Sequence, residues 1–297
     1  MKTVHAMAKL NYQGTVAFLR NGKLETMKYF HVFDKGVEQE RLLSLNSPLR
    51  EIVRDEDKVS CLFKVTKQMV VDYRPSPRSF LLDLPKNLTE IGSFYGFEVV
   101  GEEDVAMLPA YVIRISPKDD YRYARKIWVE QKQFLPLKVE VYDTNGATLE
   151  QVVFTDIEVK DKLPMVDIAK EQANQAPVST INPIQAAQVT TSSELSLNTL
   201  SVMGFSEVFL ARRALHNSGQ MADHLLLSDG FASVSVYMET KSAATASDQS
   251  STDSMQTVGA VNFYSRNLDE NLLTVLGDVP AKTVKAIAQA VKIKHAN

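Results

Sequence analysis

The chain contains few of the residues and patterns on which disulfide cross-linking or membrane insertion depends. Among 297 residues there is a single cysteine, Cys61, so no disulfide can form within one chain. We interpret Cys61 as a buried apolar thiol. No run approaches the roughly 20 consecutive apolar residues that a membrane-spanning helix requires. The sequence therefore predicts a protein without a membrane span.

An excess of positive charge is also missing. The 33 Lys and Arg residues are set against 36 Asp and Glu residues, which gives a formal net charge of -3, and the chain has no dense basic run. Proteins that bind nucleic acid carry a basic face that contacts the phosphates. We therefore expect no nucleic-acid partner.

Motifs that carry catalysis, metal binding or phosphate binding are absent from the sequence. The five histidines are scattered, with no HExxH motif and no Cys-His cluster. Ser206 lacks the second glycine of a hydrolase nucleophile elbow. The acidic groups 102–104 and 119–120 read as solvated loop residues. We predict no catalytic residue, no metal and no cofactor. A hydrolase stays open as an alternative, but it would need converging catalytic groups that the sequence does not reveal.

The first 14 residues lack the long apolar core and the small-residue cleavage site of a secretion signal. Two interpretations stay open on these residues alone. Either the protein is cytoplasmic, or the chain begins after a removed signal, with Met1 supplied for expression.

The first half of the chain reads as a meander of antiparallel strands. Asn21-Gly22 predicts a type I′ turn between strands at 12–20 and 23–33. Further short segments rich in β-branched and aromatic residues are separated by polar turns, and they cover 37–46, 49–55, 58–64, 68–73, 110–116, 123–130, 136–143 and 148–159. Only two helices are expected here, at 3–10 and at about Leu88–Tyr95.

One large sheet with so few helices leaves a face that must be covered or left as an apolar hollow. Aromatic residues on the predicted strands are candidates for the walls of a lipid cavity: Phe18, Tyr29, Phe63 and Trp128. The alternative is that they form an ordinary core beneath the helices.

The second half begins with a segment poor in charge. Residues 172–193 contain neither a charged residue nor glycine and read as a linker. Strand-like segments follow at 204–215, 224–240, 257–267 and 270–278, with Ser228-Asp229-Gly230 as a hairpin turn. Lys241–Gln256 reads as a flexible loop. A helix is expected from Pro280 onward, with Val284, Ile287, Ala288 and Val291 on one face.

These patterns predict an α+β protein of mostly antiparallel β structure. A large N-terminal domain spans 1–165, a linker 166–195, and a smaller C-terminal α+β domain 196–297.

Several segments, taken together and in order, resemble the MucB/RseB family. They are VEQERLLSLNSPLREIVRDEDKVSCLF (37–63), FLPLKVEVYDTNGATLEQVVFTDIEV (134–159), GFSEV (204–208), ARRAL (211–215), LLLSDGFASVSVYME (225–239) and GDVPAKTVKAIAQAVK (277–292). The resemblance runs from about Met7 to Ile293. One departure is that residues 198–203 lack the tryptophan and prolines that commonly precede Gly-Phe in the family.

The resemblance implies a non-catalytic negative regulator in the envelope stress response. Members are periplasmic, which favours a removed signal, and their first domain is an unclosed barrel similar to the lipoprotein carrier LolA. They bind the periplasmic domain of a transmembrane anti-sigma factor of the RseA/MucA type, which restrains a sigma factor of the sigma-E/AlgU type, and protect it from regulated proteolysis. Lipid or lipopolysaccharide fragments are the implied releasing signal.

The resemblance also gives the C-terminal domain a role in partner binding. The candidates are Phe205, Glu207, Arg212, Arg213, Asp229 and Phe231. Because side chains alternate along a strand, Arg212 and Arg213 point to opposite faces. A homo-oligomer is compatible with the sequence. The alternative function is a periplasmic lipid or lipoprotein carrier, which would need only the first domain.

Overall fold

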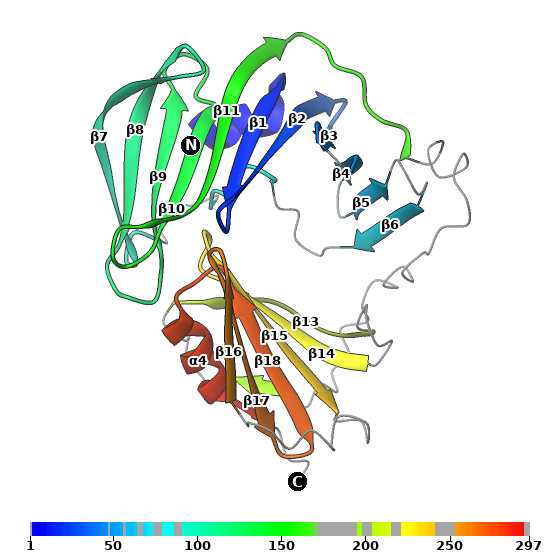
Figure 1. Cartoon of the computed structure of the whole chain (residues 1–297), viewed down its shortest axis with the longest axis vertical. Helices are drawn as coiled ribbons and strands as arrows, with labels where there is room; N and C mark the ends of the chain where they lie inside the picture. Colours follow the sequence, from blue (N-terminus) through cyan, green and yellow to red (C-terminus); the bar gives the residue numbers. More distant parts are fainter. Residues whose placement is uncertain are drawn as a thin grey trace.

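The computed structural model contains two large antiparallel sheets, each with its own core, and one small two-stranded sheet (Figure 1). It describes residues 2–46, 48–55, 58–63, 68–73, 79–85, 91–168, 170, 195–197, 204–214, 221–240 and 253–293. Within these ranges, no helix has the length and apolar character needed to cross a membrane. The prediction of a mostly antiparallel β protein is confirmed.

The first sheet has eleven strands in the order β6-β5-β4-β3-β2-β1-β11-β10-β9-β8-β7. The helix α1 (Lys2–Lys9) precedes it. The strands are β1 Asn11–Arg20, β2 Lys23–Asp34, β3 Val37–Ser44, β4 Arg50–Asp55, β5 Lys58–Phe63, β6 Gln68–Tyr73, β7 Tyr95–Val105, β8 Leu108–Pro117, β9 Ala124–Glu130, β10 Pro136–Tyr142 and β11 Thr148–Lys160. Each strand pairs with its sequence neighbour except at the β1–β11 junction, and β6 and β7 form the two edges, so the sheet is not closed.

Local turn chemistry explains the meander. Asn21 and Gly22 have φ values of 51° and 69°, and Lys35 and Gly36 have 50° and 91°, as a type I′ turn requires. Both turns therefore match the right-handed twist of their flanking strands. The predicted β1–β2 hairpin is confirmed by the register Arg20–Lys23.

The two faces of the first sheet bury different clusters. Ile127 and Val129 join the main cluster, to which α1 contributes Ala6. Trp128, between them, points to the other face and packs with Val112. This second cluster is enclosed because the sheet curls until β7 contacts β11 (Figure 1).

The second sheet has six strands in the order β13-β14-β15-β18-β17-β16. The strands are β13 Ser206–Ala214, β14 Met221–Ser228, β15 Ser233–Thr240, β16 Asp253–Val258, β17 Val261–Leu268 and β18 Asn271–Gly277. The helix α4 (Ala281–Ala290) contacts β17 and β18 and buries Val284, Ile287 and Ala288. After it, β19 (Val291–Ile293) pairs with β12 (Leu195–Leu197).

Several element boundaries differ from the sequence predictions. Val291 ends the C-terminal helix and begins β19, with an extended φ and ψ of -71° and 132°. Tyr95, predicted at a helix end, begins β7, while 86–90 lie outside the described residues. The acidic residues 102–104 belong to β7 rather than to a loop. Residues 253–256, predicted as loop, belong to β16.

Cys61 also differs from its interpretation, because it is half-buried on β5 rather than fully buried. Burial raises the pKa of its thiol. The domain limits 1–165 and 196–297 and the linker 166–195 stay predictions, since most of that linker lies outside the described residues.

Candidate functional site

The two sheets meet at a buried ion pair. The Asp229 carboxylate, in the turn between β14 and β15, accepts hydrogen bonds from Arg122 Nε at 2.7 Å and from the Tyr95 hydroxyl at 2.8 Å. The side chains of Arg122 and Asp229 are both 0% exposed. Burial, followed by the charge of Asp229, raises the pKa of Tyr95. The phenol therefore stays protonated and donates a hydrogen bond to Asp229. The first domain therefore supplies two donors to one carboxylate of the second.

The local backbone explains how Asp229 reaches across. Its Oδ1 accepts the backbone N–H groups of Phe231 and Ala232, at 3.0 and 2.8 Å, so the side chain closes its own turn. Gly230 supplies the positive φ of 98° that this turn needs. Oδ2 is left to face the first domain.

Arg122 is surrounded by aromatic rings from both domains. Its guanidinium lies 4.5 Å from the ring centroid of Phe94 and 4.9 Å from that of Phe205. It also pairs with Asp119. Cation–π contacts are strongest where water is excluded. We call this group, Arg122 with Asp229 and Tyr95, the domain joint.

Further contacts between the two domains extend the joint. Asn262 donates to the Tyr123 hydroxyl at 2.9 Å. Arg125 pairs with Asp278 at 3.2 Å. Glu150, which pairs with Arg20 on the first sheet, accepts the N–H of Ala260 from the β16–β17 turn at 3.3 Å.

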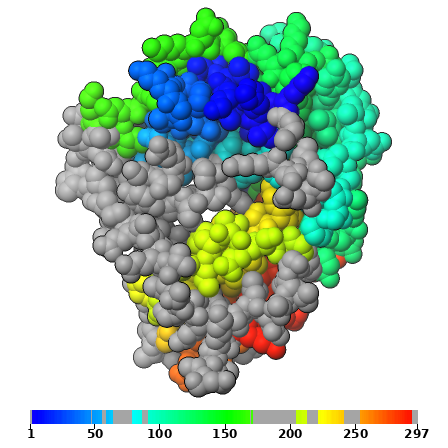
Figure 2. Space-filling view, turned by 180° about the vertical axis from the view of Figure 1, so that it is seen from behind, coloured from blue at the N-terminus to red at the C-terminus, as the bar shows by residue number. Residues whose placement is uncertain are grey.

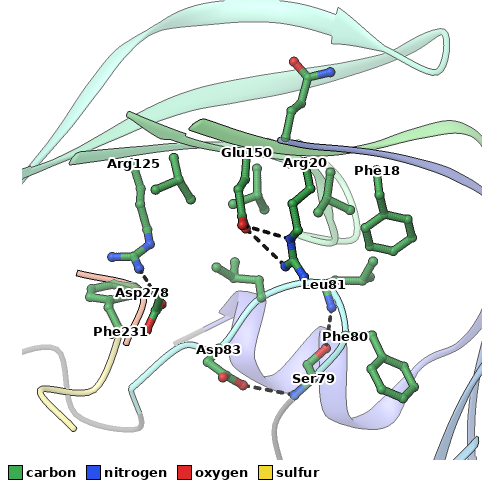
Figure 3. A pocket seen from close by; sticks show the side chains of 15 residues that line it. Phe18, Arg20, Ser79, Phe80, Leu81, Asp83, Arg125, Glu150, Phe231 and Asp278 are labelled. Carbon is green, nitrogen blue, oxygen red and sulfur yellow. Dashed lines mark hydrogen bonds and ion pairs between the residues drawn. The ribbon is translucent and has the colours of Figure 1, made fainter. Parts of the chain in front are cut away.

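A pocket of about 200 Å³ opens beside these contacts (Figure 3). Its walls mix apolar side chains with polar and charged ones, which include two ion pairs, Arg20–Glu150 and Arg125–Asp278. The lining residues are Phe18, Arg20, Ser79, Phe80, Leu81, Leu82, Asp83, Arg125, Val139, Val141, Glu150, Gln151, Val152, Phe231 and Asp278. Phe231 and Asp278 come from the second domain, so the pocket depends on the docked arrangement.

The chemistry of the lining suits binding. The lining includes neither histidine nor cysteine, and its two arginines are each paired with a carboxylate. Apolar side chains beside guanidinium groups offer contacts to both parts of an amphiphilic molecule, its apolar body and its polar end.

The structure does not bring all four predicted lipid-cavity residues together, although Phe18 packs against the main cluster that contains Tyr29. Phe18 lines the pocket. Tyr29 is 0% exposed inside the main cluster, where its hydroxyl donates to Glu40. Trp128 points to the opposite sheet face and donates to Glu103. Phe63 is half-buried on β5 and is not a lining residue.

The predicted partner-binding residues divide into two groups. Phe205, Asp229 and Phe231 are buried at or beside the joint, Phe231 with its ring 5.1 Å from that of Tyr95. They do not form an exposed surface. Glu207 and Arg212 are accessible on β13, and Arg212 lies 4.0 Å from Asp223. The side chain of Arg213 lies outside what the structure describes.

Sequence reasoning missed the first-domain half of the joint. Arg122 lies in the charged segment DDYR, which is typical of a solvated loop, and Arg125 lies on the strand predicted at 123–130. No local pattern indicates that an arginine there is buried against a carboxylate 107 residues away. Tyr95 was placed at a helix end because it shares the helical spacing of Leu88 and Ile91.

Known proteins match this chain over nearly its full length. Residues 1–176 match the MucB/RseB N-terminal domain and 190–292 the MucB/RseB C-terminal domain. The Sigma-E factor regulatory protein RseB of Salmonella typhimurium is 27% identical over 97% of this chain and 88% of its own. The Sigma factor AlgU regulatory protein MucB of Pseudomonas aeruginosa is 28% identical over 95% and 86%.

Solved structures agree on the fold. A crystal structure of MucB in complex with MucA(peri) matches with a TM-score of 0.74 at 22% identity, over 99% of this chain and 97% of that one. The Pseudomonas aeruginosa MucA/MucB complex matches with the same TM-score at 23% identity and with the same coverage. Together with the two matched domains, these likenesses show that the chain belongs to the MucB/RseB family.

Proposed function

We propose that the protein is a non-catalytic, periplasmic regulator of an envelope-stress sigma factor. It binds the periplasmic domain of a transmembrane anti-sigma factor of the RseA/MucA type and protects it from regulated proteolysis. Lipid or lipopolysaccharide fragments release it. In this proposal, residues 1–165 sense lipid, residues 196–297 contact the anti-sigma factor, and residues 166–195 join the two domains.

The relatives support the partner. They are named as regulatory proteins of sigma-E and AlgU, and MucB has been crystallised with MucA(peri). The accessible face of β13, with Glu207 and Arg212, is the part of our predicted partner surface that a second protein can reach.

The observation that carries the lipid step is the position of the pocket. Its walls come from both domains, and the domain joint lies beside it. A ligand shifts an equilibrium between two arrangements only by its difference in affinity for them. A lipid that binds between Phe18 and Phe231 changes the stability of the docked arrangement of the two domains relative to an undocked one. The surface that the anti-sigma factor contacts changes with it.

The test of partner binding is calorimetric titration with the periplasmic segment of the anti-sigma factor from the same organism. We expect stoichiometric binding and slower cleavage of the segment by its first protease when the protein is bound. Lipopolysaccharide binding without any binding of the segment would instead support a lipid carrier.

A substitution in the pocket tests the lipid step. Phe18→Asp replaces an apolar side chain of the lining by a carboxylate, in a pocket that already contains Glu150, so we expect at least a tenfold loss of lipopolysaccharide affinity in a fluorescence titration, or about 1.4 kcal/mol. Leu24→Asp, at a 68% exposed position outside the lining, is the matched control and should bind as the wild type. Equal loss in both variants would contradict the placement.

A further inference from the structure

Three glycines of the second domain lie directly against side chains of the first. Gly204 precedes β13 with a φ of 81°, Gly259 lies in the β16–β17 turn with a φ of 60°, and Gly230 lies in the β14–β15 turn. β13 and β16 are the two edges of the second sheet, so Gly204 and Gly259 lie on opposite sides of the joint. At Gly230, an added Cβ would lie 3.0 Å from Cβ of Pro85. The second domain therefore approaches the first through its backbone.

Gly204 contacts an aromatic ring that belongs to the joint. A Cβ at this position would lie 2.3 Å from Cζ of Phe94 and 2.4 and 2.7 Å from the two Cε atoms of the same ring. Carbon atoms that are not bonded to each other pack at about 3.5 to 4.0 Å, so the ring would have to move. The ring lies 4.5 Å from the Arg122 guanidinium, which the Asp229 carboxylate binds. A methyl group at Gly204 would therefore disturb the buried ion pair.

Gly259 contacts an ion pair that lines the pocket. A Cβ at Gly259 would lie 3.0 Å from Glu150 Oε1 and 3.2 Å from Arg20 Cγ. Glu150 pairs with Arg20 at 2.9 Å, and it also accepts the N–H of Ala260 at 3.3 Å. A methyl group at Gly259 would therefore either break these contacts or push the second domain away from the pocket.

The backbone conformation alone does not require such close contacts. Gly22, Gly36 and Gly146 also have positive φ values, of 69°, 91° and 85°. Within the part of the chain that the structure describes, an added Cβ at these three positions would have no neighbour within 4 Å. Those turns need glycine only for its backbone freedom. At Gly204 and Gly259 the missing side chain also lets the two domains touch.

We propose that Gly204, Gly230 and Gly259, here called the glycine contacts, set the balance between the docked arrangement of the two domains and an undocked one. Contacts of this kind bury few apolar atoms and depend on a close fit, so one added methyl group weakens them as overpacking does. We expect each methyl group to lower the ratio of docked to undocked molecules by about tenfold.

The glycine contacts thereby regulate the pocket, and this part of the inference rests on the proposed function for the pocket's ligand. Phe231 and Asp278 belong to the second domain, so the pocket loses part of its lining when the domains separate. A ligand that needs the complete lining binds only the docked molecules. Its apparent affinity falls by the factor by which the docked fraction falls.

The first test measures the distance between the domains of the full chain by double electron–electron resonance. In a Cys61→Ser background, Met107→Cys on the first domain and Met221→Cys on the second carry the spin labels, since these methionines are 94% and 48% exposed. We expect one main distance in this parent. Gly204→Ala and Gly259→Ala should each increase the population at longer distances by about tenfold.

Two further variants separate the domain contact from backbone strain. Gly36→Ala places a methyl group at a positive φ with no neighbour, so it should keep the distances of the parent. In a Phe94→Ala background the ring that the methyl group would meet is gone, so Gly204→Ala should change the docked-to-undocked ratio less than it does in the parent. Unchanged distances in Gly204→Ala and Gly259→Ala, an equal change in Gly36→Ala, or an undiminished effect without the Phe94 ring would overturn the proposal.

The second test measures lipopolysaccharide affinity of the full chain by fluorescence titration. Gly204→Ala changes no residue of the pocket lining, yet it should weaken binding by the factor by which the docked fraction falls. An affinity that stays constant while the docked fraction falls would overturn the regulation of the pocket. If the parent does not bind lipopolysaccharide at all, the lipid step of the proposed function fails, whereas the distances still decide whether the glycine contacts hold the domains.

Discussion

At the scale of single residues, Asp229 performs two tasks with its two oxygens. Oδ1 closes the turn between β14 and β15, and Oδ2 binds Arg122 and Tyr95 of the first domain. Removing one partner of a buried ion pair is far more costly than removing an exposed one, because the remaining charge stays desolvated.

Asp229→Asn tests this assignment. The amide oxygen can still close the turn, but Arg122 loses the negative charge opposite it, so we expect a loss of about 3 to 5 kcal/mol in the free energy of unfolding by urea. The control is Asp120→Asn, in the same loop as Arg122. The Asp120 side chain is 80% exposed and pairs with Lys282, so this variant should change the free energy of unfolding by less than about 0.5 kcal/mol. Similar losses in the two variants would mean that the joint is not the buried contact described.

At the scale of elements, the β7–β8 turn departs from the favoured turn chemistry. Ala106 and Met107 have φ values of 51° and 62°, a region that glycine and asparagine tolerate best, and Met107 is 94% exposed. The side chain of Met107 therefore adds backbone strain without adding buried area.

Met107→Gly should relieve that strain. Glycine gives the unfolded chain more conformational entropy, which offsets part of the relief. We therefore expect a net gain of up to about 1 kcal/mol in the free energy of unfolding. Met221→Gly, at an exposed position on β14 with ordinary strand geometry, should instead lose about 0.5 to 1 kcal/mol. A loss in the turn variant as large as that in the strand variant would contradict the strain.

Local sequence signals predicted elements well where their cause is local. Asn21-Gly22 and Ser228-Asp229-Gly230 specify their hairpins through the φ values they permit, and alternation identified most strands. β7 was missed because its glutamates and glycines resemble a loop, although pairing with β8 holds it extended. β19 was missed because Val291 continues the helical pattern and only its pairing with β12 ends the helix.

The candidate site was less predictable for the same physical reason. Phe18 could be proposed as a cavity residue because it is an aromatic residue on a predicted strand. Which face of the sheet its side chain lines depends on the packing of the whole sheet. Trp128, equally aromatic, points to the other face. The pairing of Arg122 with Asp229 depends on how two separately folded sheets dock, and no local pattern encodes it.

At the scale of the whole molecule, the second domain docks through its loops onto the first sheet. Figure 2, seen from behind, shows β13 next to the first domain and accessible on this face. Phe205, directly before β13, lies with its ring 4.9 Å from the Arg122 guanidinium of the joint. In the proposed function, this contact carries the effect of a ligand in the pocket to a partner on β13. This linkage between lipid and anti-sigma factor is the central claim of the proposed function.

The most direct measurement is the affinity for the anti-sigma periplasmic segment, by fluorescence anisotropy, with and without saturating lipopolysaccharide. We predict that lipid weakens the affinity of the wild type and of Leu24→Asp by at least about fivefold, and that Phe18→Asp, which binds lipid poorly, shows no weakening. An affinity that lipid leaves unchanged in the wild type, or weakens equally in Phe18→Asp, would contradict the account.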